Sequence, residues 1–126
     1  MRVSVSCLCS GVRFSVPGPV GDSTACHCSQ CRKTSGHFAA SFDVTETLDY
    51  QAQDTLGTYR TAAGGTRGFC SHCGSSLWFR DSDGHLSVEA GVVDGPTHSH
   101  LTSHIFVADK SDYYAIADRL PQAGGW

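Results

Sequence analysis

The chain has 126 residues, of which 40% are hydrophobic and only 17% are charged, and its formal net charge is -3 with the histidines neutral. This length suits one domain and leaves no space for a second of ordinary size. The acidic balance argues against non-specific binding to nucleic acid or to an anionic membrane. The sequence contains no targeting signal and no apolar stretch near the roughly 18 residues of a membrane span. We therefore expect a soluble, cytoplasmic protein.

The first predicted strand is Val12–Val16, where apolar and polar residues alternate with the period of a half-buried strand. Turn-forming segments rich in glycine, proline and aspartate separate it from further short strands. These strands are Ala39–Val44, Thr55–Tyr59, Ser76–Phe79, Leu86–Val92 and Ser103–Val107. Short strands at such regular spacing predict an all-β fold, a sandwich or a barrel, in a single domain of residues 1–126.

Near the C-terminus, the segment Ser111–Leu120 has the signature of a short helix. Ser111 can cap its first turn, and Pro121 follows its last residue. We therefore predict a short C-terminal helical turn after the last strand.

Seven cysteines occur in three groups along the chain. The groups are Cys7 and Cys9, then Cys26, Cys28 and Cys31, then Cys70 and Cys73. An odd number argues against a complete set of disulfides, and closely spaced cysteines in the cytosol usually indicate metal binding or redox chemistry. The two outer groups together supply four thiolates, the closed tetrahedral arrangement of a structural zinc site.

The middle group supplies three sulfurs, one fewer than a closed site needs. Cys26, Cys28 and Cys31 could hold one face of a zinc ion and leave its fourth position exchangeable, which is the pattern of catalytic zinc. Three thiolates make an electron-rich centre, better suited to activating a thiol than to activating water.

Three alternatives for the cysteines stay open. The middle group could find a fourth protein ligand and form a second structural site. Cys28 and Cys31 could instead cycle as a dithiol, although no thioredoxin-like pattern surrounds them. All the cysteines could also be buried as small hydrophobic residues, which their tight clustering argues against.

The order of these motifs resembles a known family. Cys-x-Cys, then Cys-His-Cys-x-x-Cys-Arg-Lys, then Arg-x-Phe-Cys-x-x-Cys-Gly is similar to the glutathione-dependent formaldehyde-activating enzymes, which share their domain with a centromere-associated protein. Further matches are Phe14, Gly36, His104-Ile-Phe, Lys110, Tyr113 and the segment from Asp118 to Gln122. The resemblance covers nearly the whole chain, from Cys7 to Gln122.

The resemblance implies a zinc-stabilised β-tent of stacked antiparallel sheets. It implies a structural zinc on Cys7, Cys9, Cys70 and Cys73 and a catalytic zinc on Cys26, Cys28 and Cys31. The reaction of the family joins the thiol of glutathione to formaldehyde to give S-hydroxymethylglutathione, and the reverse reaction is that of a carbon–sulfur lyase. We accordingly expect a thiol such as glutathione and a small aldehyde as the substrates.

Glutathione carries two carboxylates, so its binding site needs cations. Arg32, Lys33 and Arg67 are candidates, with Lys110 as a fourth, because arginine can bind a carboxylate through two parallel hydrogen bonds. The alternative for Arg32 and Lys33 is that they only offset the negative charge of the zinc–thiolate sites.

The histidines could serve the metal sites in two ways. His27 and His72 lie inside the cysteine loops and should point away from the sulfurs, either as hydrogen-bond donors behind the ligands or into solvent. His98, His100 and His104 could reach the open metal position, although such histidines more often lie on the surface.

Two other classes of function stay open beside the enzyme. One is a non-catalytic zinc module that binds a protein partner, with both zinc ions structural. The other is a chromosomal or nucleic-acid-binding protein, which the acidic balance and the absence of a basic run argue against. An exchangeable fourth ligand at the middle site would distinguish the enzyme from the module.

Overall fold

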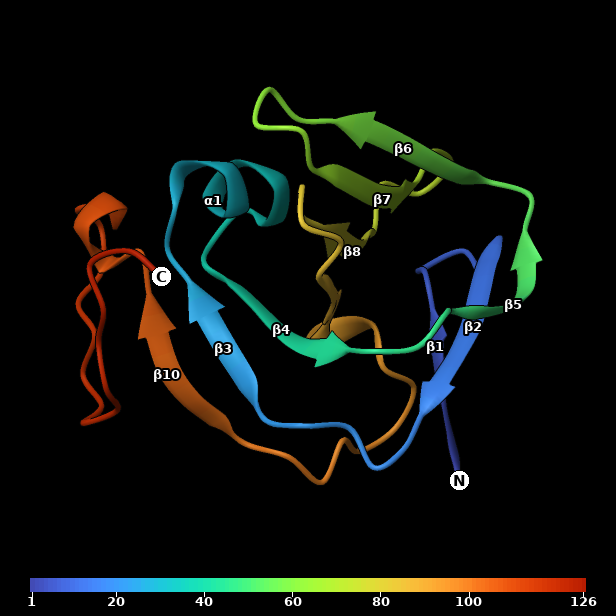
Figure 1. Ribbon diagram of the computed structural model, residues 1–126, viewed down its shortest axis with the longest axis horizontal. Helices are drawn as coiled ribbons and strands as arrows, with labels where there is room; N and C mark the ends of the chain where they lie inside the picture. Colours follow the sequence, from blue (N-terminus) through green and yellow to red (C-terminus); the bar gives the residue numbers. More distant parts are fainter.

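Ten strands form two sheets in the computed structural model, which describes residues 1–126 (Figure 1). The small sheet has the order β1-β2-β5, and the large sheet has the order β10-β3-β4-β9-β8-β7-β6. The strands are β1 (Arg2–Ser6), β2 (Val12–Pro17), β3 (Ser23–Cys26), β4 (Ala39–Val44), β5 (Asp49–Gln53), β6 (Leu56–Arg60), β7 (Thr66–Cys70), β8 (Ser76–Arg80), β9 (Leu86–Glu89) and β10 (Leu101–Ile105). The helical elements are α1 (Ser29–Ser35) and two 3-10 turns, η1 (Ala90–Val92) and η2 (Val107–Asp109). No helix has the length and apolar character that crossing a membrane requires.

The prediction of an all-β fold is confirmed, and all six predicted strands are present. The prediction for β4 agrees with the structure at both ends. The prediction for β9 runs too far, because the chain leaves the sheet at Glu89 and enters η1. The sequence analysis did not predict β1, β3, β5, β7 or the helix α1.

The antiparallel arrangement that the resemblance implies does not hold for one pair of strands. β10 runs parallel to β3, with Ile105 opposite Cys26, and the two arrows point the same way in Figure 1. After η1 the chain crosses back beneath the sheet and adds its last strand to the free edge of β3. This return places the C-terminal segment beside the middle cysteine group.

The predicted helical turn at Ser111–Leu120 is also wrong, since this segment is irregular. The Lys110 ammonium donates to the carbonyl of Ser111 at 2.8 Å and to that of Tyr114. Asp118 is held by a hydrogen bond from His104 on β10. These tertiary contacts outweigh the weak helical preference of the segment.

One face of the large sheet packs against the small sheet and forms the core. Phe42, Val88 and Trp78 stand opposite one another on β4, β9 and β8, and all three are buried with Phe14 of β2. The Trp78 indole lies flat against the backbone at Gly68, where an added Cβ would come within 2.1 Å of the ring. Every second residue of these strands therefore packs in the core.

The opposite face of the large sheet is polar and leaves room for a site. Side chains alternate between the two faces of a strand, so Ser41, Ser87 and Glu89 point away from the core. Phe79 and Arg67 continue the same face, because Ser87 pairs with Phe79 and Phe79 pairs with Arg67. This second face carries the residues of the candidate active site.

Candidate metal centres and active site

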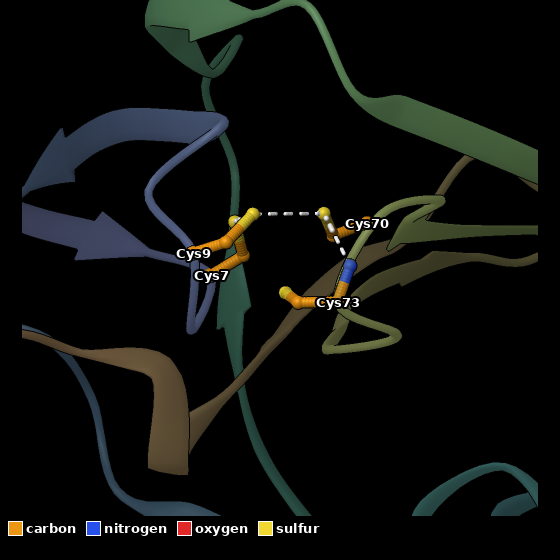
Figure 2. A group of neighbouring side chains, drawn as sticks. All are labelled: Cys7, Cys9, Cys70 and Cys73. Carbon is orange, nitrogen blue, oxygen red and sulfur yellow. Dashed lines mark hydrogen bonds between the residues drawn. The ribbon is translucent and has the colours of Figure 1, made fainter.

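Four sulfurs from two distant turns meet where the two sheets join (Figure 2). Cys7 and Cys9 lie between β1 and β2, whereas Cys70 and Cys73 lie at the turn between β7 and β8. All four Sγ atoms lie within 4.8 Å of one another, with 3.7 Å between Cys7 and Cys9 and 3.6 Å between Cys9 and Cys70. A tetrahedral zinc with Zn–S bonds of about 2.3 Å separates its sulfurs by about 3.8 Å. The four-sulfur cluster therefore has the size of a zinc site.

Hydrogen bonds to several of these sulfurs favour the thiolate form that binds a metal. The Val12 N–H donates to Cys7 Sγ at 3.3 Å, and the Cys73 N–H donates to Cys70 Sγ at 3.3 Å. Hydrogen bonds from the Ser75 hydroxyl and backbone lower the pKa of Cys73 to about 5. All seven cysteines are free of disulfides. The donor set fits a structural zinc.

The sulfurs of Cys26, Cys28 and Cys31 form a second cluster, also within 4.8 Å of one another. Cys26 ends β3, Cys28 caps α1, and Cys31 lies in the first turn of α1. Cys28 Sγ accepts a hydrogen bond from the Cys31 N–H at 3.3 Å, which begins the helix and orients both sulfurs. No histidine or carboxylate completes this cluster. A metal held here would keep one position for an outside ligand.

Three thiols at this spacing cannot all ionise without a nearby cation. Hydrogen bonds from Cys26 and Cys31 lower the pKa of Cys28 to about 2. The contact with Cys28 raises the pKa of Cys26 far above its ordinary value. A divalent cation would stabilise all three thiolates at once and release the remaining protons. The three-sulfur cluster thus fits a metal by its chemistry as well as by its size.

Arg67 is the cation that the fold places next to this cluster. Its side chain is buried, with Nη2 donating to Cys31 Sγ at 3.6 Å and Nε donating to Gln30 Oε1 at 2.7 Å. The guanidinium carbon also lies 4.6 Å from the centre of the Phe79 ring. Arg67 therefore offsets part of the negative charge of the sulfurs and fixes the start of α1 against the sheet.

A cleft of about 1220 Å³ opens over the three sulfurs along the polar face of the large sheet. The residues that line it include Cys26, Cys31, Ser41, Arg67 and Glu89, together with the β8–β9 turn. Small-molecule sites usually occupy about 300–1,000 Å³. The cleft is large enough for a tripeptide-sized thiol together with a small aldehyde.

The predicted cations lie in different places. Arg67 lines the cleft, but Arg32 and Lys33 lie in the last turn of α1 and are not among its walls. The Lys110 ammonium is bound by backbone carbonyls and lies 4.5 Å from the centre of the Tyr114 ring. Arg80, which the sequence analysis did not single out, borders the cleft, but it stands opposite Leu86 on the face that carries Trp78.

Two buried histidines and their polar partners lie behind the three-sulfur cluster. His27 and His104 are only 1% and 3% exposed. His27 Nε2 lies 2.8 Å from His104 Nδ1, and His104 Nε2 lies 2.9 Å from a carboxylate oxygen of Asp118. His27 Nδ1 contacts the hydroxyl of Tyr114. His104 is therefore a partner of His27 and lies outside the sulfur cluster.

The direction of these hydrogen bonds follows from the carboxylate. Asp118 can only accept, so His104 carries its proton on Nε2 and accepts on Nδ1. His27 then donates from Nε2 and accepts the Tyr114 hydroxyl proton at Nδ1. Burial lowers the pKa of His27, which keeps this ring neutral and suits the arrangement. Since neighbouring residues of an extended segment point to opposite sides, the buried His27 ring turns the flanking sulfurs toward the cleft.

The replacement His104→Phe is expected to lower the free energy of unfolding by about 1–3 kcal/mol, because it leaves the N–H of His27 buried without an acceptor. Thermal melting of the zinc-loaded protein at pH 7 measures this loss. His100→Phe is the matched control, since His100 is exposed. Equal melting temperatures for the His104 variant and the unmodified protein would contradict the role given to the network.

The fold and the clusters define a class: an all-β protein with one closed four-sulfur centre and one open three-sulfur centre beside a cleft. The family model described as "Glutathione-dependent formaldehyde-activating enzyme" matches residues 2–109 of the chain. The chain therefore belongs to the glutathione-dependent formaldehyde-activating enzyme family. This membership supports an enzymatic role of the lyase type.

Two curated relatives cover most of the chain. An "Uncharacterized lyase" of Schizosaccharomyces pombe is 23% identical over an alignment of 116 residues, which covers 90% of this chain and 85% of the relative. A "Putative glutathione-dependent formaldehyde-activating enzyme" of Halomonas elongata is 33% identical over 132 residues, with 94% of this chain and 83% of the relative covered. A crystal structure of a Rhodobacter sphaeroides protein shares the fold, with a TM-score of 0.59 and 22% identity over 79% of this chain and 99% of that one.

Proposed function

We propose that this protein is a zinc-dependent carbon–sulfur lyase that joins the thiol of glutathione to formaldehyde or a small aldehyde and cleaves the adduct in reverse. The observation that carries the proposal is a three-sulfur cluster that opens into a cleft and has no fourth protein ligand. Membership of the family and the names of both relatives support it. The cytoplasm, where thiols stay reduced, is the compartment that suits seven free cysteines.

In this proposal the two clusters have separate tasks. The structural zinc is held by Cys7, Cys9, Cys70 and Cys73, and the catalytic zinc is held by Cys26, Cys28 and Cys31. A zinc ion with three protein ligands supplies an exchangeable position and stabilises the charge of a thiolate or of the aldehyde oxygen.

The other residues of the cleft bind and orient the substrates. Holding the thiol sulfur and the aldehyde carbon within contact distance replaces a bimolecular encounter in water with a reaction inside one complex. Arg67 is the cation that lines the cleft on its polar face and is available to a carboxylate of glutathione. Arg32 and Lys33 stay predictions for the same role, which would require the substrate to reach beyond the cleft to α1.

The proposal is tested by two-dimensional exchange NMR of glutathione and formaldehyde at equilibrium. The zinc-loaded protein is expected to accelerate exchange between free glutathione and its hydroxymethyl adduct. Removal of the zinc at Cys26, Cys28 and Cys31 by a chelator should return the rate to the uncatalysed value, and added zinc should restore it. Exchange at the uncatalysed rate in a protein with both sites filled would overturn the proposal.

A further inference from the structure

Glu89 lies in the cleft, and its carboxyl group has no hydrogen-bond or ion-pair partner within the protein. Its side chain is absent from the ion pairs of the protein and from its side-chain hydrogen bonds. It lines the same cleft as the three sulfurs, and its oxygens are not among the buried atoms without a partner. The free carboxyl group therefore faces the space where substrates would lie.

The register of the sheet gives the position of this carboxyl group relative to the three sulfurs. Cys26 stands opposite Ala39 on β4, and Glu89 stands opposite Ser41 on the same strand. Ala39 and Ser41 are two residues apart, so all four side chains lie on one face. Two strand spacings and a two-residue offset separate the Cα atoms of Cys26 and Glu89 by about 12 Å. Both side chains project from the same face into the cleft, which has space for a few substrate atoms between them.

The environment of Glu89 gives its carboxyl group a pKa that suits proton transfer near neutral pH. Burial raises the pKa of Glu89 to about 7, against the opposing effect of the Arg67 guanidinium. The remaining charged or titratable groups that line the cleft are the three cysteines, Asp43, Glu46, Arg80, Asp81, Asp83 and His85. A carboxyl group of this kind exists in both protonation states near neutral pH, as one that accepts and then donates a proton must.

We propose that Glu89 is the acid–base catalyst of this cleft, carrying one proton between the substrate thiol and the oxygen of the aldehyde. The Glu89 carboxylate takes the proton of the thiol, and the sulfur electron pair forms the new C–S bond. The C=O π pair moves to oxygen, which receives the proton from the Glu89 carboxylic acid. Thiol and aldehyde thus give the hydroxymethyl thioether with every proton retained and the carboxylate regenerated.

The reverse reaction uses the same group in the opposite order. The Glu89 carboxylate takes the hydroxyl proton of the adduct, the C–S bond breaks as the carbonyl forms, and the departing sulfur recovers the proton. This inference rests on the proposed function, because it assigns a residue to that reaction. It also predicts that the rate rises as pH increases through about 7, since both directions begin from the carboxylate.

The first experiment measures the carboxyl group directly and needs no variant. The chain has two glutamates, Glu46 and Glu89, so labelling glutamate with ¹³C at the carboxyl carbon gives two signals. In the zinc-loaded protein, the Glu89 signal should titrate near 7. Glu89→Gln should remove this signal and thereby assign it. A Glu89 signal that titrates near the ordinary glutamate pKa of about 4.3 would overturn the inference.

The second experiment measures the exchange rate in variants. Glu89→Gln keeps the shape of the protonated side chain and is expected to slow the exchange by about 10²–10⁴-fold and to remove the rise of rate near pH 7. Zinc content and melting temperature should not change. Asp112→Asn is the control, because Asp112 is exposed and lies outside the cleft, so this variant should exchange at the full rate. Glu89→Asp keeps a carboxyl group and should recover part of the activity.

The outcomes separate the two proposals. An active parent protein whose Glu89→Gln variant exchanges equally fast, with the same pH profile, overturns the role of Glu89 alone. A zinc-loaded parent that does not accelerate exchange overturns the proposed function, and the assignment of Glu89 to it falls too. If Glu89→Gln does not fold, a Glu89→Asp variant that folds and keeps the full rate and the full pH profile still overturns the inference.

Discussion

Replacing Cys73 by serine is expected to unfold the protein. The four-sulfur cluster joins the β1–β2 turn of the small sheet to the β7–β8 turn of the large sheet (Figure 2). A metal in this position links two segments that are more than sixty residues apart, as the contact between Cys9 and Cys70 shows. The Cys73→Ser variant would keep only three thiolates at this junction.

The free energy of metal binding that is lost decides whether the Cys73→Ser variant still folds. Zinc binding at structural sites contributes about 10–16 kcal/mol in zinc-finger peptides, whereas domains are stable by only about 5–15 kcal/mol in total. Losing most of the metal affinity is therefore enough to remove the folded state. Circular dichroism, thermal melting and zinc content measure the effect. A Cys73→Ser variant that melts cooperatively near the parent temperature and holds two zinc ions would contradict it.

Local sequence patterns were sufficient to predict the strands in which apolar and polar residues alternate. Ala39–Val44 places Phe42 on the core face and Ser41 on the cleft face, and this period-two pattern is visible without a structure. β1 also alternates valine with serine, so the same signal could have found it. The pattern of β9 likewise sends Glu89 to the face opposite Val88, although it does not say that this face holds a cleft.

Contacts between distant segments were beyond the reach of these patterns. β10 pairs with β3 across more than seventy residues, and no local period reports whether such a pair is parallel. The helical signature of Ser111–Leu120 failed for the same reason, because Asp118 is recruited by His104. The buried pair of His27 and His104 also depends on this return of the chain.

The grouping of the cysteines was the part of the site that the sequence specified best. Spacing alone assigned four sulfurs to one cluster and three to another, and the structure brings together those two sets. The residue types alone could not show which cations lie beside the three-sulfur cluster, because arginine and lysine are common around thiolates. Only the fold distinguishes Arg67, which touches Cys31, from Arg32 and Lys33 on the far end of α1.

Replacing Cys28 by serine is expected to abolish catalysis and leave the fold intact. Cys28 caps α1 by accepting the Cys31 N–H, and serine is among the best residues at this position because its hydroxyl accepts the same hydrogen bond. The variant should therefore keep the helix and its contact with Arg67. It loses one thiolate of a three-sulfur set that has no protein ligand in reserve.

The size of the activity loss follows from the task proposed for the metal. A catalytic zinc contributes several kcal/mol of charge stabilisation, and each 1.4 kcal/mol is about tenfold in rate, so the exchange rate should fall by about 10³-fold or reach the uncatalysed rate. The variant should hold one zinc ion, show the parent circular dichroism spectrum and melt cooperatively. If it unfolds as Cys73→Ser does, both metal sites are structural, and the non-catalytic protein-binding module becomes the better account of the chain. If it folds, holds one zinc ion and still accelerates the exchange, the three-sulfur cluster is not the catalytic centre.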